Sequence, residues 1–112
     1  MTPTIAEVLD QAADLIQFTG WNQGDYWLIN ENEEIIGFCA LGALGGIHED
    51  RKELDNWLIR QDAKEALVRY LGLIERGDIG HWNDAEDRTA QDVIDALRGC
   101  AKVQREIEQA AR

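Results

Sequence analysis

The sequence predicts a mainly helical α+β fold: a single domain spanning residues 1–112, with about five helices and one small antiparallel β-hairpin. Three observations support this prediction. Apolar residues recur at three- and four-residue spacing over several segments, which is typical of helices with one buried face. Two short runs of β-favouring residues flank a polar turn. The chain has 112 residues, of which 45% are hydrophobic, and this length and composition suit one core.

The first helix is expected to begin at Thr4. Thr4 and Glu7 have the spacing of a capping box, in which each side chain satisfies the other residue's free backbone N–H. Gly20 is expected to end this helix. The residues between them form one apolar stripe: Ile5, Val8, Leu9, Ala12, Leu15 and Ile16.

The hairpin is predicted from two apolar runs, Tyr26–Ile29 and Ile35–Phe38, which a polar turn at residues 30–34 separates. A lone hairpin is marginal in water, so we expect it to pack on the helices. The next segment, residues 39–44, is small and apolar on all sides. It predicts a short buried helix in which Gly42 lets another backbone approach closely.

Two helices are predicted in the middle of the chain, starting at Asp50 and Asp62. Their apolar stripes are out of phase, so a break near Arg60–Asp62 would keep polar residues out of the core. Gly77 is expected to end the second helix, and residues 78–87 are expected to form a loop.

The last helix is predicted to start after Thr89, with Asp92 three residues later as its capping partner. Cys100 falls on its inner face and is expected to be a buried, unreactive thiol.

Charge excludes several function classes. The chain has 22 acidic and 11 basic residues, a net charge of −11, and residues 1–50 contain nine acids and no Lys or Arg. This argues against direct nucleic-acid binding and against attachment to an anionic membrane. No apolar run approaches the ~18 residues of a membrane span. An acidic surface instead favours a protein partner with a basic surface.

The N-terminal segment lacks the basic and apolar regions of a signal peptide, and the two cysteines are too few for a disulfide scaffold. We therefore expect both thiols to be reduced and the protein to be cytoplasmic.

Cys39 is the candidate nucleophile, since it follows a predicted strand and begins a predicted helix, where a thiolate is stabilised. His81 could act as its base, with Asn83 or Asp84 orienting the imidazole. The competing interpretation places Cys39 as a packing residue beneath the hairpin. Cys39, His81 and Asn83 are thus candidate catalytic residues.

His48, His81, Asp84 and Asp87 are of the residue types that bind metals, but they lack helical His-ligand spacing. We predict no metal and no cofactor.

Trp82-Asn83-Asp84 is the most distinctive short string. Either Trp82 fills the core while its neighbours make turn hydrogen bonds, or Trp82 anchors a recognition loop. Trp21 in the Gly-Trp-Asn-Gln-Gly loop has the same two interpretations.

Three strings occur in a fixed order: Gly20-Trp21-Asn22-Gln23-Gly24, Cys39-Ala40-Leu41-Gly42-Ala43, and Trp82-Asn83-Asp84 with Arg88-Thr89. The chain thereby resembles an uncharacterised family of small proteins from actinobacteria and their bacteriophages. Some relatives carry a second cysteine at the position of Asn22. This chain lacks that cysteine, which argues against a redox or metal site built from two cysteines.

The resemblance implies a bacterial or phage origin and no established activity. It implies that the matching strings form one cluster, in which Arg88 pairs with Asp84 or a nearby carbonyl. The candidate binding residues are Trp21, Gln23, Trp82, Asp84 and Arg88.

The sequence thus favours a small acidic accessory or regulatory protein that binds another protein. Two alternatives stay open: a Cys39-dependent hydrolase or transferase, and an acidic mimic of DNA.

Overall fold

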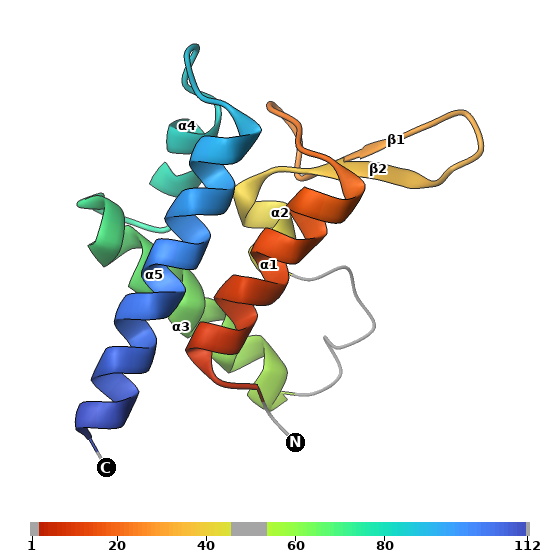
Figure 1. The fold of residues 1–112 in the computed structure, drawn as a ribbon. Coiled ribbons are helices and arrows are strands. Elements are labelled where there is room, and N and C mark those ends of the chain that lie inside the picture. Colours follow the sequence, from red (N-terminus) through yellow and green to blue (C-terminus); the bar gives the residue numbers. More distant parts are fainter. Residues whose placement is uncertain (1–2, 46–53, 112) are drawn as a thin grey trace.

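Two long antiparallel helices form the main axis of the molecule, which we describe from a computed structural model covering residues 3–45 and 54–111 (Figure 1). Helix α1 and helix α5 lie side by side, and both chain ends lie at the same end of the pair. The elements in chain order are α1 (Ile5–Thr19), β1 (Trp27–Ile29), β2 (Ile35–Phe38), α2 (Ala40–Gly45), α3 (Leu54–Leu71), α4 (Asp78–Asn83) and α5 (Ala90–Ala110). The predicted fold class is confirmed, with five helices and one hairpin in the described residues.

Both long helices begin with the predicted capping boxes. Thr4 exchanges side-chain and backbone hydrogen bonds with Glu7, and Thr89 does the same with Asp92. Each box satisfies two of the backbone N–H groups that a helix start leaves without partners.

Arginines of α5 pair with the acids of α1. Arg98 contacts Asp10 at 3.3 Å and Asp14 at 2.7 Å, and Arg105 also contacts Asp10. Part of the acidic face of α1 is therefore neutralised by the neighbouring helix.

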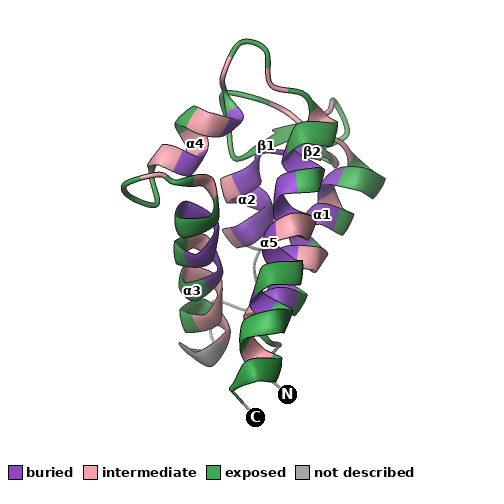
Figure 2. Cartoon of the chain, turned by 60° about the vertical axis from the view of Figure 1, so that its left-hand side comes forward, coloured by how far each residue is buried: buried purple, intermediate pink, exposed green. Residues whose placement is uncertain are grey.

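The core lies where α1, α2, α3 and α5 meet, and Figure 2 shows buried positions on the sides of α1, α2 and α3 that face one another. Leu9, Leu44, Leu67 and Leu97 are among its fully buried side chains. Cys100 is also buried there, as the apolar stripe of the last helix predicts.

The hairpin projects from the helical body at the end opposite the chain termini (Figure 1). Its strands are antiparallel, with Trp27 opposite Phe38 and Leu28 opposite Gly37. The Asn30 carboxamide oxygen accepts hydrogen bonds from the N–H groups of Asn32 and Glu34 and so holds the turn.

The predicted break near Arg60–Asp62 is wrong, because α3 continues through it. The prediction assumed that both apolar stripes are buried. Trp57 and Leu58 are instead about half exposed, so the first apolar stripe does not have to face the core. One continuous helix can therefore direct Ala63 and Leu67 into the core. The expected helix start at Asp50 lies outside the described residues.

Helix α3 ends at Leu71, not at Gly77. Gly72 follows with a φ of +70°, a conformation that glycine adopts without strain.

The segment predicted as a loop also contains a helix, α4. Ile79 and Asn83 lie on its buried side, four residues apart. A single turn gives too few apolar positions for a periodic pattern to be recognised.

Candidate functional site

The candidate residues of the three sequence strings meet at Asn83, the last residue of α4, whose side chain is fully buried. Its Oδ1 accepts hydrogen bonds from the indole Nε1–H of Trp21 at 2.8 Å and from the backbone N–H of Ala40 at 3.0 Å. Its Nδ2 donates to the Asn22 carbonyl at 3.1 Å and to Asp84 Oδ1 at 3.0 Å. Asn83 therefore joins the loop after α1, the start of α2 and the end of α4.

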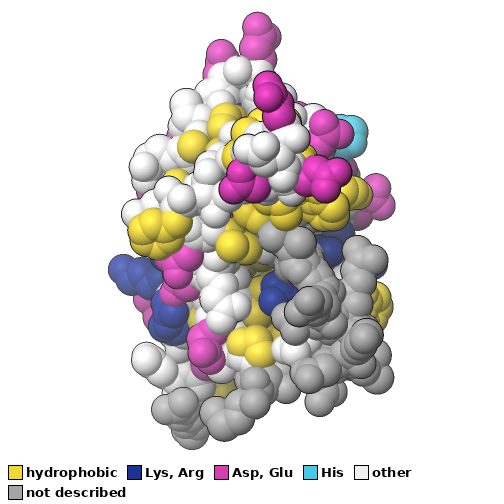
Figure 3. All heavy atoms as spheres, turned by 90° about the vertical axis from the view of Figure 1, so that its right-hand side faces the viewer, with side chains coloured by type: hydrophobic (Ala, Val, Ile, Leu, Met, Phe, Trp, Pro, Cys, Tyr) yellow, Lys and Arg dark blue, Asp and Glu magenta, His cyan; other side chains and the backbone are white. Residues whose placement is uncertain are grey.

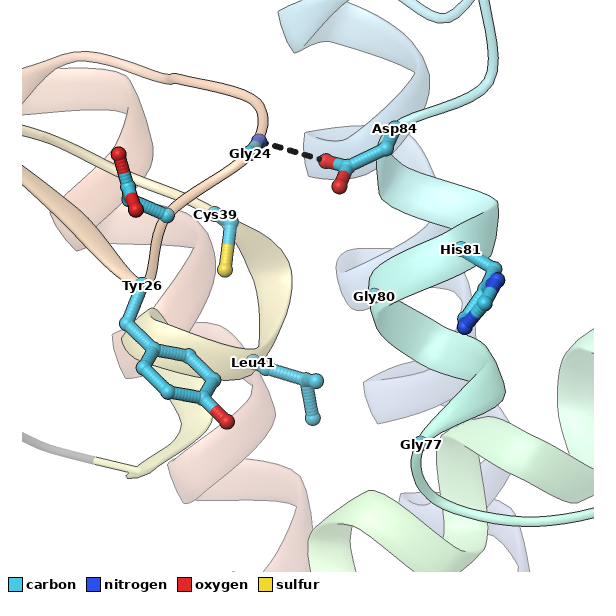
Figure 4. Close-up of a pocket in the computed structure, with 9 residues that line it drawn as sticks. Gly24, Tyr26, Cys39, Leu41, Gly77, Gly80, His81 and Asp84 are labelled. Atoms are coloured by element: carbon cyan, nitrogen blue, oxygen red, sulfur yellow. Dashed lines mark hydrogen bonds between the residues drawn. The ribbon is translucent and has the colours of Figure 1, made fainter.

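Gln23 and Asp84 make further bonds between the same two loops. Gln23 Nε2 donates to the carbonyls of Asn83 and Ala85, at 3.1 and 3.0 Å. Asp84 Oδ1 accepts from the N–H of Gly24 at 3.0 Å (Figure 4). These contacts fix the loop that leads into β1, so they set where the hairpin leaves the helical body.

Arg88 lies over the ring of Trp82 and bonds to a carbonyl of its own loop, whereas its stacking on the indole was not predicted from the sequence. Its guanidinium carbon lies 4.1 Å from the centre of the indole ring, and its Nε donates to the Trp82 carbonyl at 2.9 Å. Trp82 is partly buried and packs against the core. Its ring thus has an intramolecular cation–π partner.

Cys39 lies directly before α2 and is buried. Its Sγ accepts a hydrogen bond from the N–H of Gly42 at 3.3 Å, as a helix-capping side chain does. Burial raises the pKa of this thiol, and the N–H of Gly42 opposes that effect without cancelling it. The protonated thiol is the favoured form at neutral pH, which is the reverse of an activated nucleophile.

The structure does not join Cys39 to His81. His81 is exposed and projects to the side of α4 away from Cys39 (Figure 4). Asn83 cannot orient an imidazole, because both donors and both acceptor positions of its carboxamide are already used. The three candidate catalytic residues therefore do not form a nucleophile–base–orienter arrangement.

An open cavity of about 600 Å³ lies between the start of the hairpin and α4 (Figure 4). Tyr26, Cys39 and Leu41 line one side, and His81 and Asp84 line the other. Its volume is in the range of small-molecule sites, and its carboxylates would favour a cationic group over an anion.

Two further findings bear on the sequence predictions. Within residues 3–45 and 54–111, no three His, Cys, Asp or Glu side chains are grouped as they would be to hold a metal ion. His48 lies outside these residues. Among the described helices, none is long and apolar enough to cross a membrane.

Sequence reasoning missed the exposure of the hairpin. The strands and the residue before β1 carry large apolar side chains that the helices leave in contact with solvent: Tyr26 (62% exposed), Trp27 (37%), Leu28 (44%), Ile29 (50%) and Ile36 (42%). Only the end of the hairpin at Gly37 and Phe38 is buried. The expectation that the hairpin packs on the helices therefore holds at its base and fails along β1.

A signal for this exposure was present in the sequence. A hairpin with one buried face alternates apolar and polar residues, whereas both runs here are apolar at successive positions. Successive side chains point to opposite faces of a strand, so a hairpin that packs on the helices through one face leaves its other apolar side chains exposed.

The fold and this cluster define a small helical domain whose hairpin is fixed by a hydrogen-bonded asparagine. The chain belongs to a family of unknown function, DUF6197, whose family model matches residues 1–103. Comparison with curated proteins and with solved structures gave no match.

Proposed function

We propose that the protein acts by binding another protein through its hairpin, as a small accessory or regulatory protein. The observation that supports this most is the exposed apolar surface of β1 and β2. Large apolar groups gathered on one projecting element are typical of an interaction site, whereas single exposed apolar residues are ordinary. Aromatic side chains such as Tyr26 and Trp27 are enriched at the centres of interfaces.

Charge indicates the kind of partner. Asp25, Glu31, Glu33 and Glu34 are exposed beside the apolar strands, and the segment from Gly20 to Cys39 contains no Lys or Arg. Figure 3 shows acidic side chains grouped around the projecting end, with hydrophobic side chains directly beneath them. An apolar centre with an acidic rim is complementary to a partner that carries an apolar patch within a basic surface.

The other two hypotheses have less support. The thiol enzyme is not supported by His81, which projects away from Cys39. A DNA mimic needs exposed, unpaired acids, whereas Asp10 and Asp14 are paired with arginines of α5. A cytoplasmic location and an actinobacterial or phage origin are part of the proposal.

The test is a pull-down from a lysate of the organism that encodes the chain. The variant Glu31→Lys/Glu33→Lys/Glu34→Lys should lose the proteins that the wild type retains. The matched control is Glu75→Lys/Glu86→Lys/Glu106→Lys, which makes the same charge change at exposed acids outside the hairpin. Equal retention by both variants would contradict the proposal, and displacement of the retained proteins by duplex DNA would favour the mimic.

A further inference from the structure

The free backbone edge of the hairpin can be located from the hydrogen bonds of Phe38. The Phe38 N–H donates to the Gly20 carbonyl at 3.0 Å, and the Phe38 carbonyl accepts from the Asn22 N–H at 3.2 Å. Both groups therefore point away from β1. The outer edge of β2 is covered at this position by residues 20–22.

Trp27 is opposite Phe38, so its own N–H and C=O must point away from β2. Directly opposite residues of an antiparallel pair alternate between hydrogen-bonded and non-hydrogen-bonded pairs. Cys39 N–H donates to the Tyr26 carbonyl at 3.1 Å, which is the hydrogen-bonded pair next to Trp27 and Phe38. Trp27 and Phe38 thus form the non-hydrogen-bonded pair.

The outer edge of β1 is open among the described residues. None of them hydrogen-bonds to the outward N–H or C=O of Trp27. β1 contains no Lys, Pro or inward-pointing charge that would oppose pairing. It has three residues and a register irregularity between Leu28 and Ile29, so the edge open to a partner is short and centred on Trp27.

We infer that β1 receives an extended segment of the partner protein as a third strand, and that this segment carries Lys or Arg at both ends of an apolar stretch. This inference rests on the proposed hairpin function and specifies its partner. The outward groups of Trp27 supply main-chain hydrogen bonds, and the exposed side chains of Trp27, Leu28 and Ile29 supply apolar contacts. Asp25 precedes β1 and Glu31 follows it, so basic residues about six positions apart in the bound segment can meet both carboxylates.

Charge argues against a second copy of the chain as the added strand. Each hairpin region carries Asp25, Glu31, Glu33 and Glu34 without a base. Pairing β1 with β1 would bring two such sets together, and like charges across neighbouring strands are destabilising.

The probe for this inference is a displayed library of random twelve-residue peptides, selected against the complete protein. The enriched peptides should have apolar stretches flanked by Lys or Arg. With one of them bound, amide hydrogen exchange at Trp27 should slow by at least tenfold, because its N–H becomes hydrogen-bonded, while exchange in α5 should stay unchanged.

Two substitutions at one position separate backbone from side-chain contributions. Trp27→Ala removes the indole alone, whereas Trp27→Pro also removes the outward N–H; proline is tolerated at a strand edge whose N–H faces solvent. Trp27→Pro should bind the selected peptide at least tenfold more weakly than Trp27→Ala. Circular dichroism and the unfolding midpoint of each variant show that both are folded.

Three outcomes would overturn the inference: equal peptide affinity of the two variants, unchanged exchange at Trp27, or enrichment of acidic or uncharged peptides. Self-association of the protein with protection of Trp27 would also overturn it in favour of a second copy. The proposed function is judged separately by the pull-down, since a partner can dock on the side chains of the hairpin without adding a strand.

Discussion

The indole Nε1–H of Trp21 donates a 2.8 Å hydrogen bond to Oδ1 of Asn83, so one side-chain pair joins the loop after α1 to the end of α4. The same oxygen accepts the first backbone N–H of α2. The position of the hairpin between this loop and α2 therefore depends on one buried carboxamide.

Asn83→Ala should reduce the free energy of unfolding by about 3–5 kcal/mol. It leaves the Trp21 indole N–H and the buried Ala40 N–H without acceptors, and each such group costs about 1–3 kcal/mol. Urea denaturation measures the change, with Asn32→Ala in the exposed hairpin turn as the control, expected to lose under about 1 kcal/mol. Similar losses in both variants would contradict the role assigned to Asn83.

Gly42→Ala should destabilise the protein by about 3 kcal/mol or more, since overpacking against backbone leaves little room for relaxation. A Cβ at Gly42 would lie 1.9 Å from the Tyr26 carbonyl oxygen, so α2 and the start of β1 would have to separate. Gly45→Ala in the same helix is the control, because its Cβ would meet no atom within 4 Å. The thermal midpoint should fall in the first variant alone; a Gly42→Ala protein as stable as wild type would show that this contact is not tight.

Ionisation of the Cys100 thiol should lower the free energy of unfolding in alkaline solution. Burial raises the pKa of its thiol from 9.0 to about 11, and Arg69 opposes this shift. Below pH 9 both folded and unfolded states carry the neutral thiol, so its contribution is fully present. Between pH 9 and 11 the unfolded thiol ionises first, and a shift of this size lowers the free energy of unfolding by about 2–3 kcal/mol.

The measurement is the difference between wild type and Cys100→Ala in urea denaturation from pH 8 to pH 11. This comparison cancels the titration of tyrosines and lysines that both proteins share. The two stability curves should converge as pH rises, because the variant lacks the shifted group. Parallel curves would contradict the raised pKa.

Iodoacetamide should modify Cys39 in the folded protein more slowly than in urea at pH 8, because burial raises the pKa of this thiol and hinders access. The modification of Cys100 should be slower still. Its rate should be about 100-fold below that of Cys100 in the unfolded chain, because the pKa of the buried thiol is about two units higher. Mass spectrometry of single-cysteine variants separates the two rates. A Cys39 rate faster than that of an unfolded thiol would revive the nucleophile hypothesis.

Local sequence signals predicted the elements whose determinants are close in the chain. The boxes of Thr4 with Glu7 and Thr89 with Asp92 need three-residue spacing alone, so the starts of α1 and α5 were predictable. The continuity of α3 was not, because it depends on Trp57 and Leu58 remaining partly exposed. That is a property of the packed molecule and not of the helix pattern.

The sequence could indicate which residues belong together in the candidate site, but not which hydrogen bonds join them. The resemblance grouped Trp82, Asn83 and Arg88 with the other strings, and Arg88 does bond to a carbonyl. The role of Asn83 depends on partners 43 and 62 residues away, and no local pattern specifies such contacts. The sequence pattern therefore could not indicate that Asn83 is structural rather than catalytic.

The most direct test of the central claim compares exposed apolar residues inside and outside the hairpin. Leu28 lies opposite Gly37, which has no side chain, and is 44% exposed, whereas Ile74 is 92% exposed in a separate loop. The measurement is the dissociation constant of the purified partner from the pull-down for Leu28→Ser and for Ile74→Ser. We expect Leu28→Ser to weaken binding at least tenfold, about 1.4 kcal/mol, and Ile74→Ser to leave it unchanged. Unchanged affinity in Leu28→Ser, or an equal loss in both variants, would contradict the hairpin as the binding surface.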